Sequence, residues 1–96
     1  MHVLNIVHKY LTDCLTLTGI IYQEMKNYHK GFEYFEEASK NEEKNPSYPN
    51  LIQLARNYDN MDICLSYQND HSTGLKYRMK AVKTIDAVSP CVQYAN

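Results

Sequence analysis

Cysteine is scarce in this chain of 96 residues, and the three that occur are far apart and form no CxxC pair. An odd number of separated cysteines does not fit a disulfide framework. Cys14 and Cys64 both fall within helical patterns. We therefore expect both to be small buried thiols in a reducing compartment.

Long apolar runs and an excess of charge of one sign are also lacking. No apolar run approaches the roughly 18 residues of a membrane span, and the first ten residues show no signal-peptide pattern. Ten Lys and Arg against eleven Asp and Glu give a formal net charge of −1, which provides no attraction to nucleic acid or to an anionic membrane. The sequence predicts a soluble cytoplasmic protein with neither a nucleic-acid nor a membrane partner.

Motifs for catalysis or metal binding are absent from the sequence. It has no Gly-rich phosphate loop, no GxSxG elbow and no Cys/His nucleophile arrangement. Its four histidines share no ligand spacing with a cysteine or a carboxylate. Glu33, Glu36 and Glu37 are close in the sequence, and we expect them to form the solvated face of a helix and not a pair of catalytic carboxylates. We expect no enzymatic activity, no cofactor and no metal site.

Proline and glycine are sparse, with three of each, and the stretches between them indicate helices. Residues 3–25 contain no proline and one glycine, and their apolar residues recur at spacings of three and four. This pattern predicts one long helix, or two helical segments with a slight break near Tyr10. A second helix is predicted over 28–41, after Asn27, whose side-chain oxygen can accept a hydrogen bond from an amide of the first turn.

Pro46 and Pro49 lie in the one long loop that the sequence predicts. Helices over 50–68 and 72–88 follow, and Asp70 is the N-cap of the second of these. We expect the apolar residues of the last helix to be buried: Leu75, Met79, Val82 and Ile85. The predicted fold is a single all-α domain, residues 1–96, with four main helices in two antiparallel pairs stacked as a right-handed superhelix fragment.

An internal repeat supports the two helix pairs. Four pairs of like residues each lie 43 residues apart: Asn27 and Asp70, Tyr22 and Leu65, Gly31 and Gly74, Ala38 and Ala81. A constant offset at four positions is hard to obtain by chance. It indicates two copies of one helix pair, over about 11–44 and about 50–88.

The first copy resembles the tetratricopeptide repeat. The matching positions are Leu15, Thr18-Gly19, Tyr22, Gly31, Phe35 and Ala38. Gly19 lets the second helix approach closely, while Tyr22 and Phe35 fill the seam beside it. The offset exceeds the usual period of about 34 residues. Units of this length, with Ala55-Arg56 and Asn60 in the first helix, are most similar to those of the bacterial peptide-pheromone receptors (the Rap, NprR and PlcR group).

The second copy departs from the pattern, because Asp62 stands in the small-residue position and Arg78 in the aromatic one. A carboxylate in a close helix crossing is costly unless it is paired. Two registers are open. Either Asp62 meets Arg78 across the helix pair, which preserves the constant offset, or the first helix slips by two residues, so that Cys64 and Tyr67 take the two positions.

The resemblance implies a peptide-binding groove lined by the first helix of each pair. The groove-facing residues of the first copy are Asp13, Thr16, Leu17, Ile20 and Glu24, and those of the second are Arg56, Asp59, Asn60, Ile63 and Tyr67. Arg56 and Asn60 are four residues apart and share a helix face. The arginine suits a carboxylate and the asparagine a peptide main chain, as in the family. The alternative is that Arg56 pairs with Asp59 or Asp13 on a solvated face.

The sequence thus predicts a non-catalytic module that binds a peptide or a partner protein. One alternative is a fragment of a pheromone-responsive transcriptional or signalling regulator, and another is a dimerisation unit without a ligand. Solenoids need about three units or polar end caps. Two uncapped units predict self-association through the apolar ends, most simply as a twofold homodimer.

Overall fold

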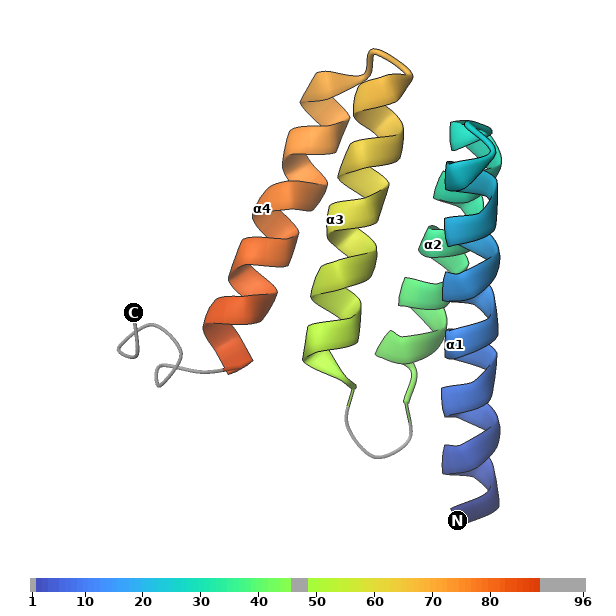
Figure 1. The fold of residues 1–96 in the computed structure, drawn as a ribbon. Coiled ribbons are helices and arrows are strands. Elements are labelled where there is room, and N and C mark those ends of the chain that lie inside the picture. Colours follow the sequence, from blue (N-terminus) through green and yellow to red (C-terminus); the bar gives the residue numbers. More distant parts are fainter. Residues whose placement is uncertain (1, 46–48, 89–96) are drawn as a thin grey trace.

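The computed structural model describes residues 2–45 and 49–88, which fold into four α-helices (Figure 1). The helices are α1 (His2–Glu24), α2 (Tyr28–Glu43), α3 (Leu51–Tyr67) and α4 (His71–Val88). These two ranges contain no strand, so the prediction of an all-α fold with four main helices is confirmed. Pro46 lies outside the described residues.

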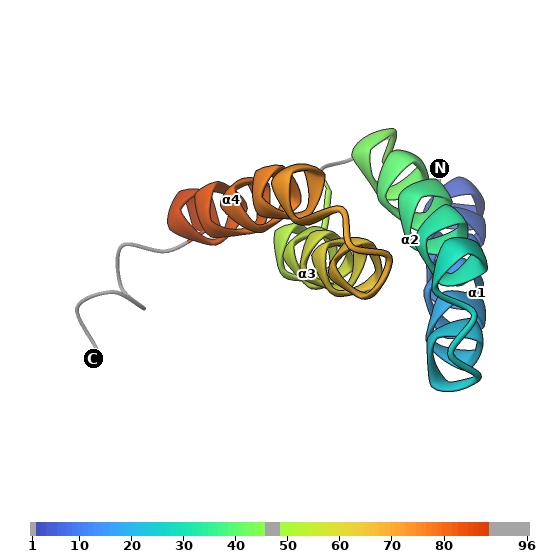
Figure 2. The same ribbon diagram turned by 90° about the horizontal axis from the view of Figure 1, so that it is seen from above.

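The helices form two hairpins that lie side by side, with α2 and α3 at the junction (Figures 1 and 2). Extensive contacts run from α1 to α2, from α2 to α3 and from α3 to α4. The molecule measures 40 × 34 × 18 Å along its principal axes. It is therefore an open layer of helices, and not a closed four-helix bundle. The right-handed superhelical stacking stays a prediction.

Asparagine and aspartate cap three of the helices, because their side-chain oxygens accept from first-turn amides that have no helical partner. Asn27 Oδ1 accepts from the Lys30 amide at 3.3 Å, and Asp70 Oδ1 accepts from the Thr73 amide at 3.3 Å. Both predicted caps are thus confirmed. Asn50 Oδ1 caps α3 in the same way, accepting from the Gln53 amide at 3.1 Å.

The two hairpin turns have the same backbone geometry 43 residues apart. Lys26 and Asn69 adopt positive φ angles of 63° and 65°. The next amides reach back to the ends of α1 and α3: Asn27 N to Tyr22 O at 2.8 Å, and Asp70 N to Leu65 O at 2.9 Å. Both turns are Schellman motifs, in which a left-handed residue lets the last helical carbonyls be satisfied.

The helix crossings also correspond. A Cβ added to Gly31 would lie 3.3 Å from the Gly19 carbonyl oxygen, and one added to Gly74 would lie 3.3 Å from the Asp62 carbonyl oxygen. Asp62 Oδ2 lies 3.9 Å from Arg78 Nη1. Of the two registers left open by the sequence, the first is therefore correct: Asp62 faces Gly74 as Gly19 faces Gly31, and it meets Arg78.

The hydrophobic core lies between α2, α3 and α4. Its buried members are Phe35, Leu54, Ala55, Tyr58, Met61, Cys64 and Ala81, with Tyr28, Phe32, Leu51 and Tyr77 packed against them. Phe35 closes the seam at Gly19, since a Cβ there would lie 2.9 Å from the Phe35 ring. The close approach predicted at Gly19 is confirmed.

Two burial expectations are wrong. The apolar residues of α4 are exposed, with Leu75 at 56% and Val82 at 55%. The packed side of α4 instead consists of Gly74 and Ala81, with half-buried Tyr77, because an open layer gives an outer helix only one neighbour face. Cys14 is also exposed, whereas Cys64 is buried as expected.

Candidate functional site

The predicted binding residues lie on α1 and α3, which meet at Thr16. The Gln53 side-chain amide donates to Thr16 Oγ1 at 3.0 Å, and Thr16 Oγ1 donates to Asn57 Oδ1 at 3.2 Å. A hollow of about 240 Å³ is lined by Asp13, Thr16, Leu17 and Gln53. The three predicted residues in this hollow all belong to α1, and α3 contributes Gln53 in place of its predicted residues.

Gln53 is a site residue that the sequence reasoning missed. It lies three residues before Arg56 and so on the same side of α3, one turn nearer the N-terminus. That spacing is the only signal in the sequence that could have identified it.

The remainder of this face continues towards the hairpin turns. Leu17 is 60% exposed, and Ile20, Glu24 and Ile63 are exposed as well. Tyr67 is exposed on one side and stacks on Tyr28 of α2 on the other, with ring centroids 4.4 Å apart. Of these five residues only Leu17 lines the hollow. The other four form an open, mainly apolar surface beside it.

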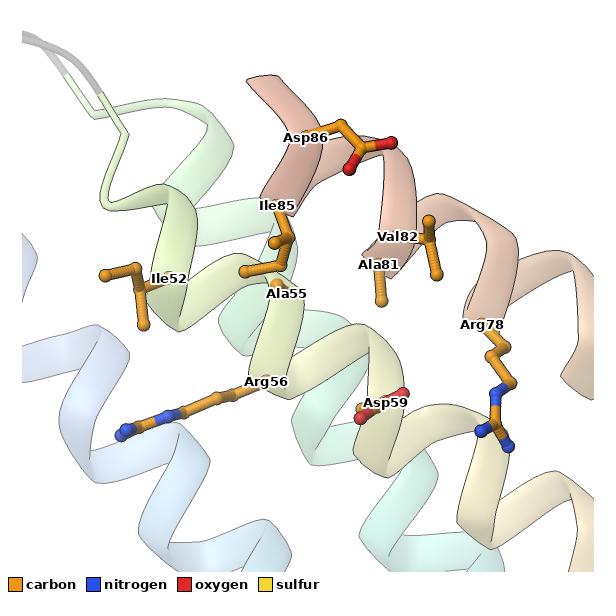
Figure 3. A pocket seen from close by; sticks show the side chains of 9 residues that line it. All are labelled: Ile52, Ala55, Arg56, Asp59, Arg78, Ala81, Val82, Ile85 and Asp86. Atoms are coloured by element: carbon orange, nitrogen blue, oxygen red, sulfur yellow. The ribbon is translucent and has the colours of Figure 1, made fainter. Parts of the chain in front are cut away.

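Arg56 and Asp59 do not line the hollow beside Thr16. Both line a second groove, of about 380 Å³, between α3 and α4. Figure 3 shows the Arg56 side chain extending away from α4, past the edge of this groove. Among the described residues Arg56 forms no ion pair, so the alternative pairing with Asp59 or Asp13 is not observed. Asn60 is half-buried one turn further along α3.

Polar contacts hold α1 in place. The Asn41 side-chain amide donates to Thr12 Oγ1 at 2.8 Å and to the His8 carbonyl at 3.1 Å, and the His8 ring contacts the Asn41 carbonyl. Asn57 is fully buried, and its amide nitrogen has no partner among the described residues. These directional bonds help to define the position of α1 along α2 and α3.

The groove between α3 and α4 is lined by small, apolar and charged side chains (Figure 3). Ala55 and Ala81 are buried at 5% and 6% exposure, and the exposed residues Ile52, Val82 and Ile85 also line the groove. The charged residues Asp59, Arg78 and Asp86 complete the lining.

The two groups with large pKa shifts belong to the core. Burial raises the pKa of the Cys64 thiol to about 11. Burial, together with the nearby Glu43 carboxylate, raises the pKa of the Tyr58 hydroxyl to about 12. Both shifts move the groups further from neutral pH, so neither is prepared for nucleophilic or acid–base chemistry.

Comparison with known proteins gives no identification: no model of a protein family matches the chain, and no curated protein or solved structure matches it either. The similarity to tetratricopeptide repeats therefore stays a prediction. Within the part of the chain that the structure describes, no three His, Cys, Asp or Glu side chains gather as metal ligands would. No helix in that part is long and apolar enough to cross a bilayer.

Proposed function

We propose that this chain is a non-catalytic interaction module that binds an extended peptide segment of a partner protein on the face shared by α1 and α3. The observation that carries the proposal is the hollow between the first helices of the two hairpins, lined by Asp13, Thr16, Leu17 and Gln53. It combines a carboxylate, a hydroxyl, an amide and an apolar side chain within one concave patch.

Such a combination suits an extended peptide. A peptide main chain offers unpaired donors and acceptors at every residue, which amide side chains can bind in both directions. Exposed Leu17, Ile20 and Ile63 provide apolar area for the alternate side chains of the peptide. Asn60, on the same helix as Gln53 and two turns further on, makes no side-chain hydrogen bond within the described residues and supplies a second amide.

The test begins with selection of short peptides from a random phage-displayed library on the immobilised chain. The best synthetic peptide is then titrated into the labelled chain, and amide chemical shifts are followed. We expect shifts at Leu17, Gln53 and Asn60. Asn60→Ala and Leu17→Ala should each weaken binding about tenfold, the equivalent of about 1.4 kcal/mol.

Glu37→Ala is the matched control, because Glu37 is exposed on α2, away from this face. It should leave the affinity unchanged, and circular dichroism should show equal helix content in all variants. The proposal is wrong if no peptide is selected, or if the selected peptide binds Asn60→Ala and Leu17→Ala as tightly as the unchanged chain.

A further inference from the structure

The groove between α3 and α4 corresponds to a surface that is covered in the first hairpin. Its floor and wall residues Ala55, Ala81 and Val82 lie 43 residues after Thr12, Ala38 and Ser39. Those three earlier residues are buried, at 1%, 0% and 2% exposure. In the second hairpin Ala55 and Ala81 are buried as well, but Val82 is 55% exposed, because no described residue covers it.

The helix that covers the first groove is α3. Its Met61 sulfur accepts from Ser39 Oγ at 3.7 Å, and the amide of its cap residue Asn50 donates to Glu42 Oε2 at 2.7 Å. Further along, Cys64 Sγ lies 3.3 Å from the position a Cβ would take on Gly31. Within one chain, α3 is therefore a helix that docks in a groove of this type.

The counterpart of α3 in the first hairpin is α1, and the corresponding face of α1 is uncovered. The cap residue Asn50 and four residues of α3 touch the first hairpin: Gln53, Asn57, Cys64 and Tyr67. Their counterparts 43 residues earlier are Val7, Tyr10, Cys14, Ile21 and Glu24, all of which are exposed. Val7, Tyr10 and Ile21 are 57%, 66% and 58% exposed, so this face offers a helical stripe of apolar side chains.

The two uncovered faces are chemically matched. Within one chain, the polar residues Asn50 and Glu42 form a hydrogen bond between the start of α3 and the end of α2. The counterparts of this pair are Val7 and Ile85, both apolar and exposed. Polarity has thus changed on both sides together, which keeps the contact complementary.

Two further matches concern charged and aromatic groups. The hydrogen bond from Gln53 to Thr16 corresponds to Tyr10 facing Asp59, where the phenol can donate to the carboxylate. The stacked pair of Tyr67 and Tyr28 corresponds to Glu24 facing His71, an acid opposite a base. No like charges are brought together at these positions.

We propose that α1 of a second copy docks in the groove between α3 and α4, as α3 docks between α1 and α2 within one chain. The contact joins two different surfaces and is head-to-tail, whereas the apolar ends alone suggested a twofold dimer. A head-to-tail contact leaves one free groove and one free α1 in every dimer, so assembly continues to longer arrays unless a ring closes. This proposal is independent of peptide binding on the face of α1 and α3.

Two variants and their mixture test the proposal. Val82→Glu places a charge in the groove, and Ile21→Glu places one on the docking face of α1. Both residues are more than half exposed, so folding should be unaffected. In sedimentation velocity, the unchanged chain should form dimers and larger species as its concentration rises, and each variant alone should associate at least about tenfold more weakly.

The mixture separates head-to-tail from twofold contacts. Val82→Glu retains an intact α1 and Ile21→Glu retains an intact groove, so an equimolar mixture should form a one-to-one heterodimer and nothing larger. A twofold contact between α4 helices, or between α1 helices, would leave one variant self-associating and the mixture no better. Either result overturns the proposal, as does an unchanged chain that stays monomeric at high concentration.

Ile20→Glu is the matched control, since Ile20 is an exposed apolar residue of α1 whose counterpart, Ile63, is not among the α3 residues that touch the first hairpin. It should assemble normally while losing peptide binding, which keeps failure of this proposal distinct from failure of the proposed function. A chain ending at residue 88 tests a different occupant. If it associates where the full chain does not, residues 89–96 fill the groove in the full chain, and docking of a second copy is wrong.

Discussion

Gly19 packs closely against the ring of Phe35, and an added methyl group tests how firmly that contact is packed. A Cβ at Gly19 would lie 2.9 Å from two ring atoms of Phe35 and 3.1 Å from a third. Phe35 is fully buried, so its ring cannot move aside without disturbing the core. Overpacking costs about 1–3 kcal/mol, which exceeds the gain of about 1 kcal/mol from replacing glycine by alanine in a helix. We expect Gly19→Ala to lower the free energy of unfolding by about 1 kcal/mol in urea titrations.

Gly74→Ala is the comparison for this measurement. The nearest atom to its added Cβ is a carboxylate oxygen of Asp62 at 2.6 Å, at the end of a side chain that can rotate. The loss of stability should therefore be smaller than for Gly19→Ala. The reverse order would show that the seam at Gly19 is not the tighter of the two.

At the residue scale, the sequence identified the contacts that depend on the shape of a single side chain. Gly19 with Phe35, and Asp62 with Arg78, were predicted from their positions in the repeat. The polar contacts of Asn41, Gln53 and Asn57 were not. A buried amide inside a helix has the same sequence signal as an exposed one, because it does not contribute to the apolar periodicity.

Among the elements, the two hairpin turns share one backbone geometry but place different residues at the position with positive φ. Lys26 has φ of 63° and Asn69 has φ of 65°. A side chain with a Cβ is strained in this region by about 1–2 kcal/mol, whereas asparagine tolerates it better. Glycine removes the strain but adds conformational freedom to the unfolded chain. We expect Lys26→Gly to raise the free energy of unfolding by about 0.5 kcal/mol.

Asn69→Gly serves as the internal comparison and should change stability less, since asparagine is already suited to the turn. Thermal unfolding of both variants at one low protein concentration would rank them. If Lys26→Gly is the less stable of the two, the turn does not store the strain inferred from its φ angle.

Helix positions and caps were predictable because they depend on local sequence. The apolar spacing, Asn27 and Asp70 placed the four helices to within a few residues. The buried face of α4 was not predictable in the same way, because Leu75 and Val82 follow helical spacing as well as Ala81 does. Which stripe is buried depends on the neighbouring helix, and in this layer α3 covers the side that carries the small residues.

At the scale of the whole molecule, α1 and α3 are held by different interactions. Among residues 6–24 of α1, the buried residues are Thr12, Thr16 and Gly19, and the contacts of this helix to Asn41 and Asn57 are polar. By contrast, α3 packs against both α2 and α4 and supplies most of the hydrophobic core. Detachment of α1 uncovers the Phe35 ring at Gly19 but removes no member of the core cluster, whereas detachment of α3 removes most of that cluster.

This difference predicts unequal local stability. Regions with few buried apolar contacts open at a lower free-energy cost than the core does. We expect amides in the middle of α1 to be protected from hydrogen exchange at least about tenfold less than those in the middle of α3, a difference of about 1.4 kcal/mol in opening free energy. The measurement uses the Val82→Glu chain at low concentration, so that docking by a second copy does not contribute. Equal protection of α1 and α3 would mean that the polar contacts of Thr12 and Thr16 couple α1 fully to the core, and the four helices would then unfold as one unit.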